Sequence, residues 1–174
     1  MPRLSSSALP IADAVLRILI ALNWFYGAIV FAILVGMFAA EQWMMTALGV
    51  PPSAHSGALI IGMRAIAALG LVAVPLNLAV LTRLVAIVQS VRADDPFIAA
   101  NADRLQAIAW FLLGQQMLSL VIALIGKAVS TPGHTLHLDA GFSPSGWLAV
   151  ILTFVLARVF AEGAQMREDL EGTV

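Results

Sequence analysis

The residues best placed for chemistry are polar side chains inside long apolar segments. Arg64 lies in the run from Gly57 to Ile87, and amides interrupt the apolar segments at Asn77, Gln115 and Gln116. An ionisable group at the centre of a membrane helix costs roughly 2.5–3.5 kcal/mol on insertion scales, so such a group is usually paired or functional. Arg64 lies about 10 Å along a helix from Gly57, so its side chain can extend to the headgroups or donate a structural hydrogen bond. The alternative is a contact with a ligand or ion, whereas the amides fit interhelical hydrogen bonds of about 0.6 kcal/mol each.

A second group of polar residues forms the connection Gln89–Ile108, QSVRADDPFIAANADRLQAI, in an otherwise apolar chain. Carboxylates ahead of Pro96 are typical of a helix start, because they can cap free N–H groups and proline tolerates an early helical position. We therefore predict a short interfacial helix over about 96–100. Two interpretations are open for this connection: a capped hairpin loop, or a docking surface for a cytoplasmic protein. The docking residues would be Asp94, Asp95, Phe97, Asn101 and Arg104.

The C-terminal segment REDLEGTV carries a comparable mixture of charges. Just before it, Arg158 and Glu162 are four residues apart, which places them on one helix face, where an exposed pair adds roughly 0.2–0.5 kcal/mol. Charge runs usually face water, so a solvated helix end is one interpretation of the segment. The alternative is a partner-binding tail, in which Arg167 and Asp169 join the docking residues of the connection.

Metal, nucleotide and catalytic motifs do not emerge from the remaining residues. His134, His137 and Asp139 could meet His55, but their spacing fits no standard zinc pattern. The sequence has no cysteine, no phosphate-binding loop, no nucleotide glycine pattern and no HExxH. No nucleophile and base can be paired. We therefore expect no catalytic residue, no metal, no cofactor and no enzymatic activity.

Four long apolar segments must position these residues. The chain is 61% hydrophobic and 11% charged, with a mean hydropathy of +0.96, whereas soluble domains are about 25% charged. The runs predict membrane helices over about 15–40, 57–90, 104–127 and 145–168 in one membrane domain, 1–174, since about 20 apolar residues span a bilayer. Pro75 predicts a kink in the second helix. The expected fold is all-α, a polytopic integral membrane protein with four transmembrane helices, packed closely through Gly27, Gly36, Gly57, Gly62 and Gly70.

The basic residues predict the orientation of these helices. Seven arginines precede the first helix, flank the second connection or end the fourth helix: Arg3, Arg17, Arg83, Arg92, Arg104, Arg158 and Arg167. The opposite side has only Lys127, apart from Arg64 within a helix. By the positive-inside rule the N-terminus, the C-terminus and the connection Gln89–Ile108 are cytoplasmic. The net charge of -1 argues against direct nucleic-acid binding.

Two short signatures give the chain a family resemblance. Pro96, Phe97, Asn101, Arg104 and Leu105 match a P-F, N, R-L pattern, and a second pattern, F-x-x-G-x-x-x-x-x-D, is matched by Phe160, Gly163 and Asp169. In these residues the chain resembles domain of unknown function 2975, a family of small bacterial four-helix membrane proteins without an established activity. The resemblance implies a multi-pass protein of the bacterial cytoplasmic (inner) membrane. Because members are often encoded beside small helix-turn-helix regulators, it also implies a transcription regulator as partner.

Two functional hypotheses follow. The first is a membrane-embedded sensor or regulatory partner of a cytoplasmic helix-turn-helix regulator, which it contacts through the connection and the C-terminal tail. The second is a small transporter or channel, built as a homo-oligomer around Arg64 and the amides, since four helices alone rarely enclose a pore. The lipid bilayer is a partner in both.

Overall fold

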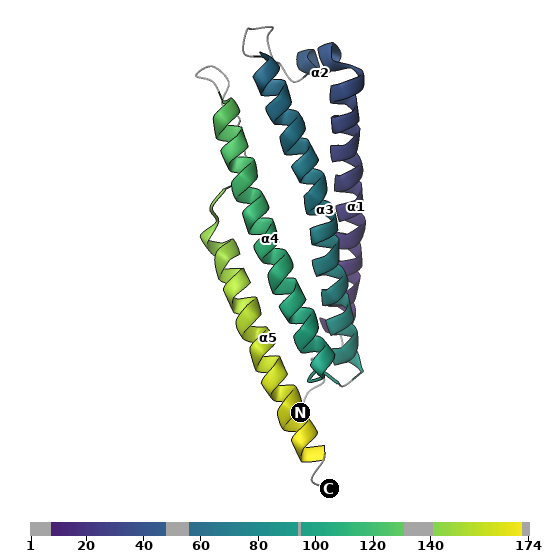
Figure 1. Cartoon of the computed structure of the whole chain (residues 1–174). Helices are drawn as coiled ribbons and strands as arrows, with labels where there is room; N and C mark the ends of the chain where they lie inside the picture. The colour runs from purple at the N-terminus through teal and green to yellow at the C-terminus, as the bar shows by residue number, and fades with distance from the viewer. Residues whose placement is uncertain (1–7, 48–55, 94, 131–140, 172–174) are drawn as a thin grey trace. The chain divides into compact units, whose positions relative to one another are not determined.

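The described part of the chain is almost entirely helical (Figure 1). The computed structural model describes residues 8–47, 56–93, 95–130 and 141–171. Within these ranges the helices are α1 (Ala8–Ala39), α2 (Glu41–Ala47), α3 (Ser56–Arg92), α4 (Ala99–Val129) and α5 (Pro144–Glu171), and no described residue forms a strand. The expected all-α class is therefore confirmed, and each predicted membrane helix has a counterpart.

Four of the helices are long and apolar enough to cross a membrane: α1, α3, α4 and α5. Their apolar side chains are largely exposed, as Trp24 (61%), Phe25 (65%) and Leu124 (66%) illustrate. Soluble monomers rarely expose apolar patches larger than a few hundred Å², whereas lipid accommodates such a surface. Length and exposure together indicate a multi-pass membrane protein.

The chain divides into two compact units, each of which is described by itself. Unit 1 comprises Met1–Asn23, Leu76–Gly114 and Pro144–Val174, and unit 2 comprises Trp24–Pro75 and Gln115–Ser143. Helices α1, α3 and α4 each contribute one segment to both units, and α3 continues as a helix through Pro75.

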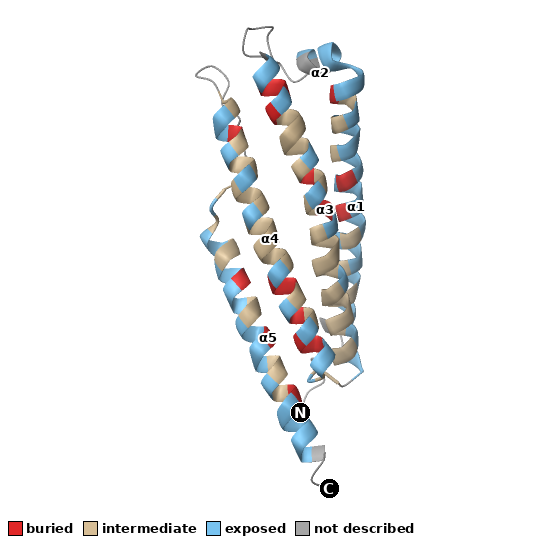
Figure 2. Ribbon diagram, viewed as in Figure 1, coloured by how far each residue is buried: buried red, intermediate tan, exposed pale blue. Residues whose placement is uncertain are grey.

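The core of unit 1 lies between α4 and α5. Its buried residues include Ala102 and Ala109 on α4, and Ala157 and Ala164 on α5, each pair one heptad apart (Figure 2). Small residues at this spacing let two membrane helices approach closely. The edge-to-face contact of Trp110 with Phe154, whose centroids are 5.4 Å apart, extends the same interface.

Unit 2 packs through glycines, as the sequence predicts. A Cβ built on Gly62 of α3 would lie 2.4 Å from Cγ1 of Val129 at the end of α4, and one on Gly27 of α1 would lie 3.1 Å from Cγ1 of Val74. Close packing is thus confirmed at these two positions. Gly57 has nothing within 4 Å of such an atom, so the prediction is wrong there.

The backbone corrects one local prediction and adds one helix. The short interfacial helix over 96–100 does not form, because residues 95–98 are non-helical and Ala99 already begins α4. There the Pro96 carbonyl accepts a hydrogen bond from the side chain of Asn101, which satisfies it without a helical N–H. Directly after the first predicted membrane helix, the chain forms the seven-residue helix α2.

Candidate functional site

Asn101 joins the end of α3 to the start of α4 in unit 1. It is fully buried, with an exposed fraction of 0%. Its Nδ2 donates to Ser90 Oγ at 2.7 Å and to the Pro96 carbonyl at 2.8 Å, and its Oδ1 accepts from Arg104 Nη1 at 2.7 Å. Buried amides are costly unless satisfied. Asn101, a predicted docking residue, therefore stabilises the connection between α3 and α4. It has no exposed surface that a partner could contact.

Phe97 fixes α5 to the same connection. Its ring lies 5.3 Å from that of Phe160, centroid to centroid, and a Cβ on Gly163 would come within 3.0 Å of its Cδ1. Because Gly163 has no side chain, it leaves the space on α5 into which the Phe97 ring packs. The two signatures of the sequence meet here, because Phe97 belongs to the first and Phe160 and Gly163 to the second.

An ion pair also joins α5 to the connection, on the exposed side of these contacts. Arg167 Nη1 of α5 donates to Asp95 Oδ1, and the two side chains are 45% and 42% exposed. Exposed ion pairs stabilise a fold by about 0–1 kcal/mol. The pair can therefore exchange with water or with another charged group at little cost. We call Asp95, Phe97, Asn101, Phe160, Gly163 and Arg167 together the α5 clamp.

The remaining predicted docking residues lie around the clamp. Arg104 is half-buried and donates to Asn101, and Asp169 is exposed and has an interaction partner. Asp94 lies outside the described residues. Around the clamp residue Arg167, Gln165–Leu170 are all exposed, and the last turns of α5 present the apolar side chains of Met166 (62%) and Leu170 (72%).

Arg64 of unit 2 caps the end of α1. Its Nη2 donates to the Met37 carbonyl and to Glu41 Oε2, at 2.5 and 2.8 Å, and its Cζ lies 4.4 Å from the centroid of the Phe38 ring. The last four carbonyls of a helix have no intrahelical donor, and a cation there also complements the helix dipole. The structural hydrogen bond expected of Arg64 is thus confirmed. Its partner Glu41 belongs to α2, the helix that sequence reasoning missed.

The intramembrane amides are less well defined as a site. Asn77 and Gln115 each take part in an interaction. Gln116 is half-buried. The interhelical hydrogen bonds expected of these amides therefore stay a prediction.

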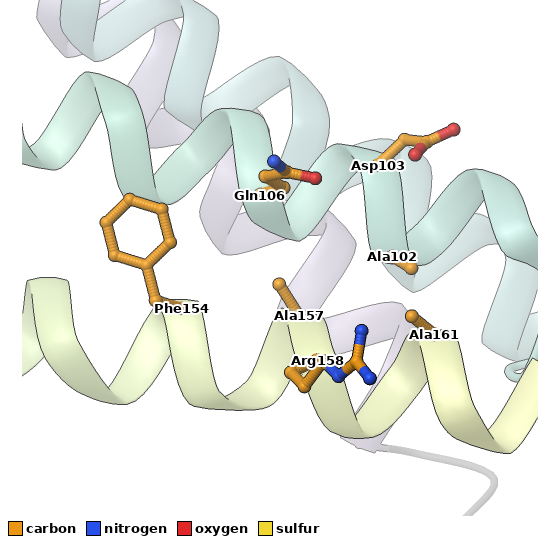
Figure 3. Close-up of a pocket in the computed structure, with 7 residues that line it drawn as sticks. All are labelled: Ala102, Asp103, Gln106, Phe154, Ala157, Arg158 and Ala161. Carbon is orange, nitrogen blue, oxygen red and sulfur yellow. The ribbon is translucent and has the colours of Figure 1, made fainter.

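A pocket of about 290 Å³ opens between α4 and α5 in unit 1. Ala102, Asp103 and Gln106 of α4 and Phe154, Ala157, Arg158 and Ala161 of α5 line it. Figure 3 shows Phe154 at one end, Asp103 and Ala161 toward the other, and Gln106 and Arg158 between them. The predicted pair of Arg158 and Glu162 is confirmed, with 2.9 Å between Nε and Oε1. Sequence reasoning missed the pocket, since it needs the two helices in contact.

The candidate metal ligands cannot be placed. His55, His134, His137 and Asp139 lie outside the described residues. Among the residues that are described, no group of three or more His, Asp or Glu side chains could hold a metal ion.

No protein-family model matches the chain, and no curated protein or solved structure is similar to it. The resemblance carried by the two signatures therefore stays a prediction. The geometry gives part of those signatures a physical meaning, because Phe97 of the first packs on Phe160 and Gly163 of the second.

Proposed function

We propose that this protein is a membrane-embedded regulatory partner of a cytoplasmic protein, in the bacterial inner membrane, and that the end of α5 is the contacting element. The observation that carries the proposal is the exposed end of α5, Gln165–Leu170. Met166 and Leu170 are four residues apart on one helix face and are 62% and 72% exposed. Apolar side chains at this spacing are the anchors by which a helix binds in a groove of a partner protein.

The charges around these anchors favour a protein surface over lipid as their environment. Arg167, Glu168 and Asp169 separate the two apolar residues. Charged side chains at hydrocarbon depth cost several kcal/mol, so this segment is more stable outside the hydrocarbon. Phe160, Gly163 and Arg167 tie the end of α5 to the connection before α4. A preformed binding element loses less conformational entropy on association.

The resemblance suggests the class of partner, a helix-turn-helix transcription regulator. Transport or channel activity is the alternative from the sequence. It is less well supported, because the Nη2 of Arg64, the residue around which it would be built, already binds two oxygens of its own chain. The regulatory function is therefore the better supported of the two.

The test is photo-crosslinking in native membranes with a photoreactive residue at position 170. The matched control carries it at Leu152, which is also exposed, at 52%, but lies in the apolar part of α5. We expect a DNA-binding regulator to be captured at position 170 and not at position 152. Capture of the protein alone at both positions would refute the proposal and direct attention to flux assays with Arg64 variants.

A charge swap then separates partner contact from clamp stability. Asp95→Arg and Arg167→Asp each break the ion pair, and the double variant restores it with reversed polarity. If Asp95 and Arg167 also touch the partner, the double variant regains stability but does not regain capture at position 170. Recovery of both in the double variant would show that the pair only holds α5 in place.

A further inference from the structure

The pocket between α4 and α5 lies where a membrane changes from hydrocarbon to headgroups. Between Arg104 and Lys127, α4 has no charged residue, and at 1.5 Å per residue this stretch is about 33 Å long. The hydrocarbon core of a bilayer is about 30 Å thick. Asp103 and Gln106 therefore lie at the headgroup boundary of the leaflet on the side of the α3–α4 connection.

The pocket joins an apolar part to a polar part. Ala102 and Ala157 are buried, and the Phe154 ring closes one end. The short side chains of Ala102, Ala157 and Ala161 leave the apolar part of the pocket open to an acyl chain. Asp103, Gln106 and Arg158 supply a carboxylate, an amide and a guanidinium on the polar side.

These polar groups keep unused hydrogen-bonding capacity within the part of the chain that the structure describes. The Nε of Arg158 donates a hydrogen bond to Glu162, and the two η nitrogens of Arg158 have no protein partner among the described residues. The side chains of Asp103 and Gln106 likewise make no hydrogen bond to a described residue. The site therefore offers N–H donors to a phosphate, and carboxylate and amide oxygens to a cation.

We propose that this pocket binds a phospholipid whose headgroup carries both a phosphate and a primary ammonium, as phosphatidylethanolamine does. Arg158 binds the phosphate, while Asp103 and the Gln106 carbonyl accept hydrogen bonds from the ammonium. The charges select this headgroup, because the pocket lining carries one carboxylate, Asp103, and one guanidinium, Arg158. A headgroup with both a phosphate and an ammonium complements both charges, whereas an anionic headgroup without an amine leaves Asp103 unpaired beside the phosphate. A quaternary choline ammonium has no N–H to donate, so it cannot replace the primary amine.

The experiment is native mass spectrometry of the purified protein with three lipids that have identical acyl chains. The headgroups are phosphatidylethanolamine, phosphatidylglycerol and phosphatidylcholine. We expect the ethanolamine lipid to be retained about threefold to fivefold better than the other two, the size expected for one or two partly exposed charged contacts. Equal retention of all three would show unselective surrounding lipid and would overturn the proposal.

Variants assign the selectivity to the pocket. Arg158→Gln should lower retention of the ethanolamine lipid about threefold, and Asp103→Asn should remove its advantage over phosphatidylcholine. Ala161→Leu should fill the groove and lower retention of all three lipids. The matched control is Arg17→Gln, which breaks another exposed Arg–carboxylate pair four residues apart, that of Arg17 with Asp13 on α1, away from the pocket.

Far-UV circular dichroism melting identifies any variant that fails to fold, and Arg158→Lys, which keeps the charge, should retain most of the selectivity. An unchanged preference in folded Arg158→Gln and Asp103→Asn would overturn the proposal. A water-soluble competitor, O-phosphoethanolamine, distinguishes the source of the headgroup. Displacement of the lipid by equimolar competitor would show a soluble ligand and would also overturn the proposal.

Discussion

Replacing Asn101 tests whether the α5 clamp depends on one buried amide. Asn101→Ala removes three hydrogen bonds of 2.7–2.8 Å from a side chain with no exposed surface. Neutral hydrogen bonds contribute about 1 kcal/mol each and charged ones about 1.5–3 kcal/mol. Arg104 is half-buried and regains water as a partner, so we take the low end for its bond. After subtraction of the roughly 0.5 kcal/mol advantage of alanine in a helix, the expected loss in the free energy of unfolding is about 3 kcal/mol.

Asn101→Asp refines this test, because the substitution keeps the shape and changes only the donor. The new carboxylate still accepts from Arg104, but it places an acceptor against the Pro96 carbonyl. Ser90 cannot compensate, since its hydroxyl already donates to the Ile87 carbonyl at 2.8 Å. We expect a loss of about 2–3 kcal/mol from this one variant, since a buried acceptor without a donor costs about 1–3 kcal/mol.

The assay is reversible unfolding in mixed micelles, followed by far-UV circular dichroism as the denaturing detergent fraction rises. The matched control is Gln89→Ala, beside Ser90, because Gln89 is exposed and its side chain has no hydrogen bond to a described residue. The control should stay within about 0.5 kcal/mol of the parent protein. An Asn101→Asp variant as stable as that control would refute the account of the clamp.

Two further predictions concern unit 2. Gly62→Ala should destabilise the protein by about 1–3 kcal/mol, because its new Cβ would come within 2.4 Å of Val129, whereas Gly57→Ala, with open space, should be neutral or stabilising by up to about 1 kcal/mol. The same unfolding assay compares the two, and equal stabilities would contradict the close packing. Arg64→Gln should speed hydrogen exchange in the last turn of α1, since the capping cation is lost; Glu41→Gln, which breaks only a partly exposed ion pair, should cost less than about 1 kcal/mol. An unchanged exchange rate in Arg64→Gln would contradict the capping role.

The sequence predicts best what depends on local rules. The four spanning helices follow from long apolar runs, and the Arg158–Glu162 pair follows from spacing on one helix. Contacts between residues that are distant in the sequence cannot be predicted in this way, because hydrophobic periodicity does not give the register of one helix against another. Asp95 and Arg167 are 72 residues apart, and each was expected to face a partner. One usable signal was overlooked: Gly163 inside a helix costs about 1 kcal/mol relative to alanine, so its presence requires a packing reason.

Two polar residues that the sequence marks as candidates, Arg64 inside an apolar segment and Asn101 in the polar connection, show that polarity alone does not indicate function. Asn101 donates to the Pro96 carbonyl, and Arg64 donates to the Met37 carbonyl. The Met37 carbonyl lies in the last turn of α1, where no helical N–H is available to it, and the Pro96 carbonyl lies just before α4 and accepts from a side chain. The chain thus uses these two polar side chains to complete its own backbone. Function is better sought where polar groups keep spare hydrogen-bonding capacity at an accessible surface. In unit 1 that condition is met by Asp103, Gln106 and Arg158, three residues whose significance becomes visible only when α4 and α5 are in contact.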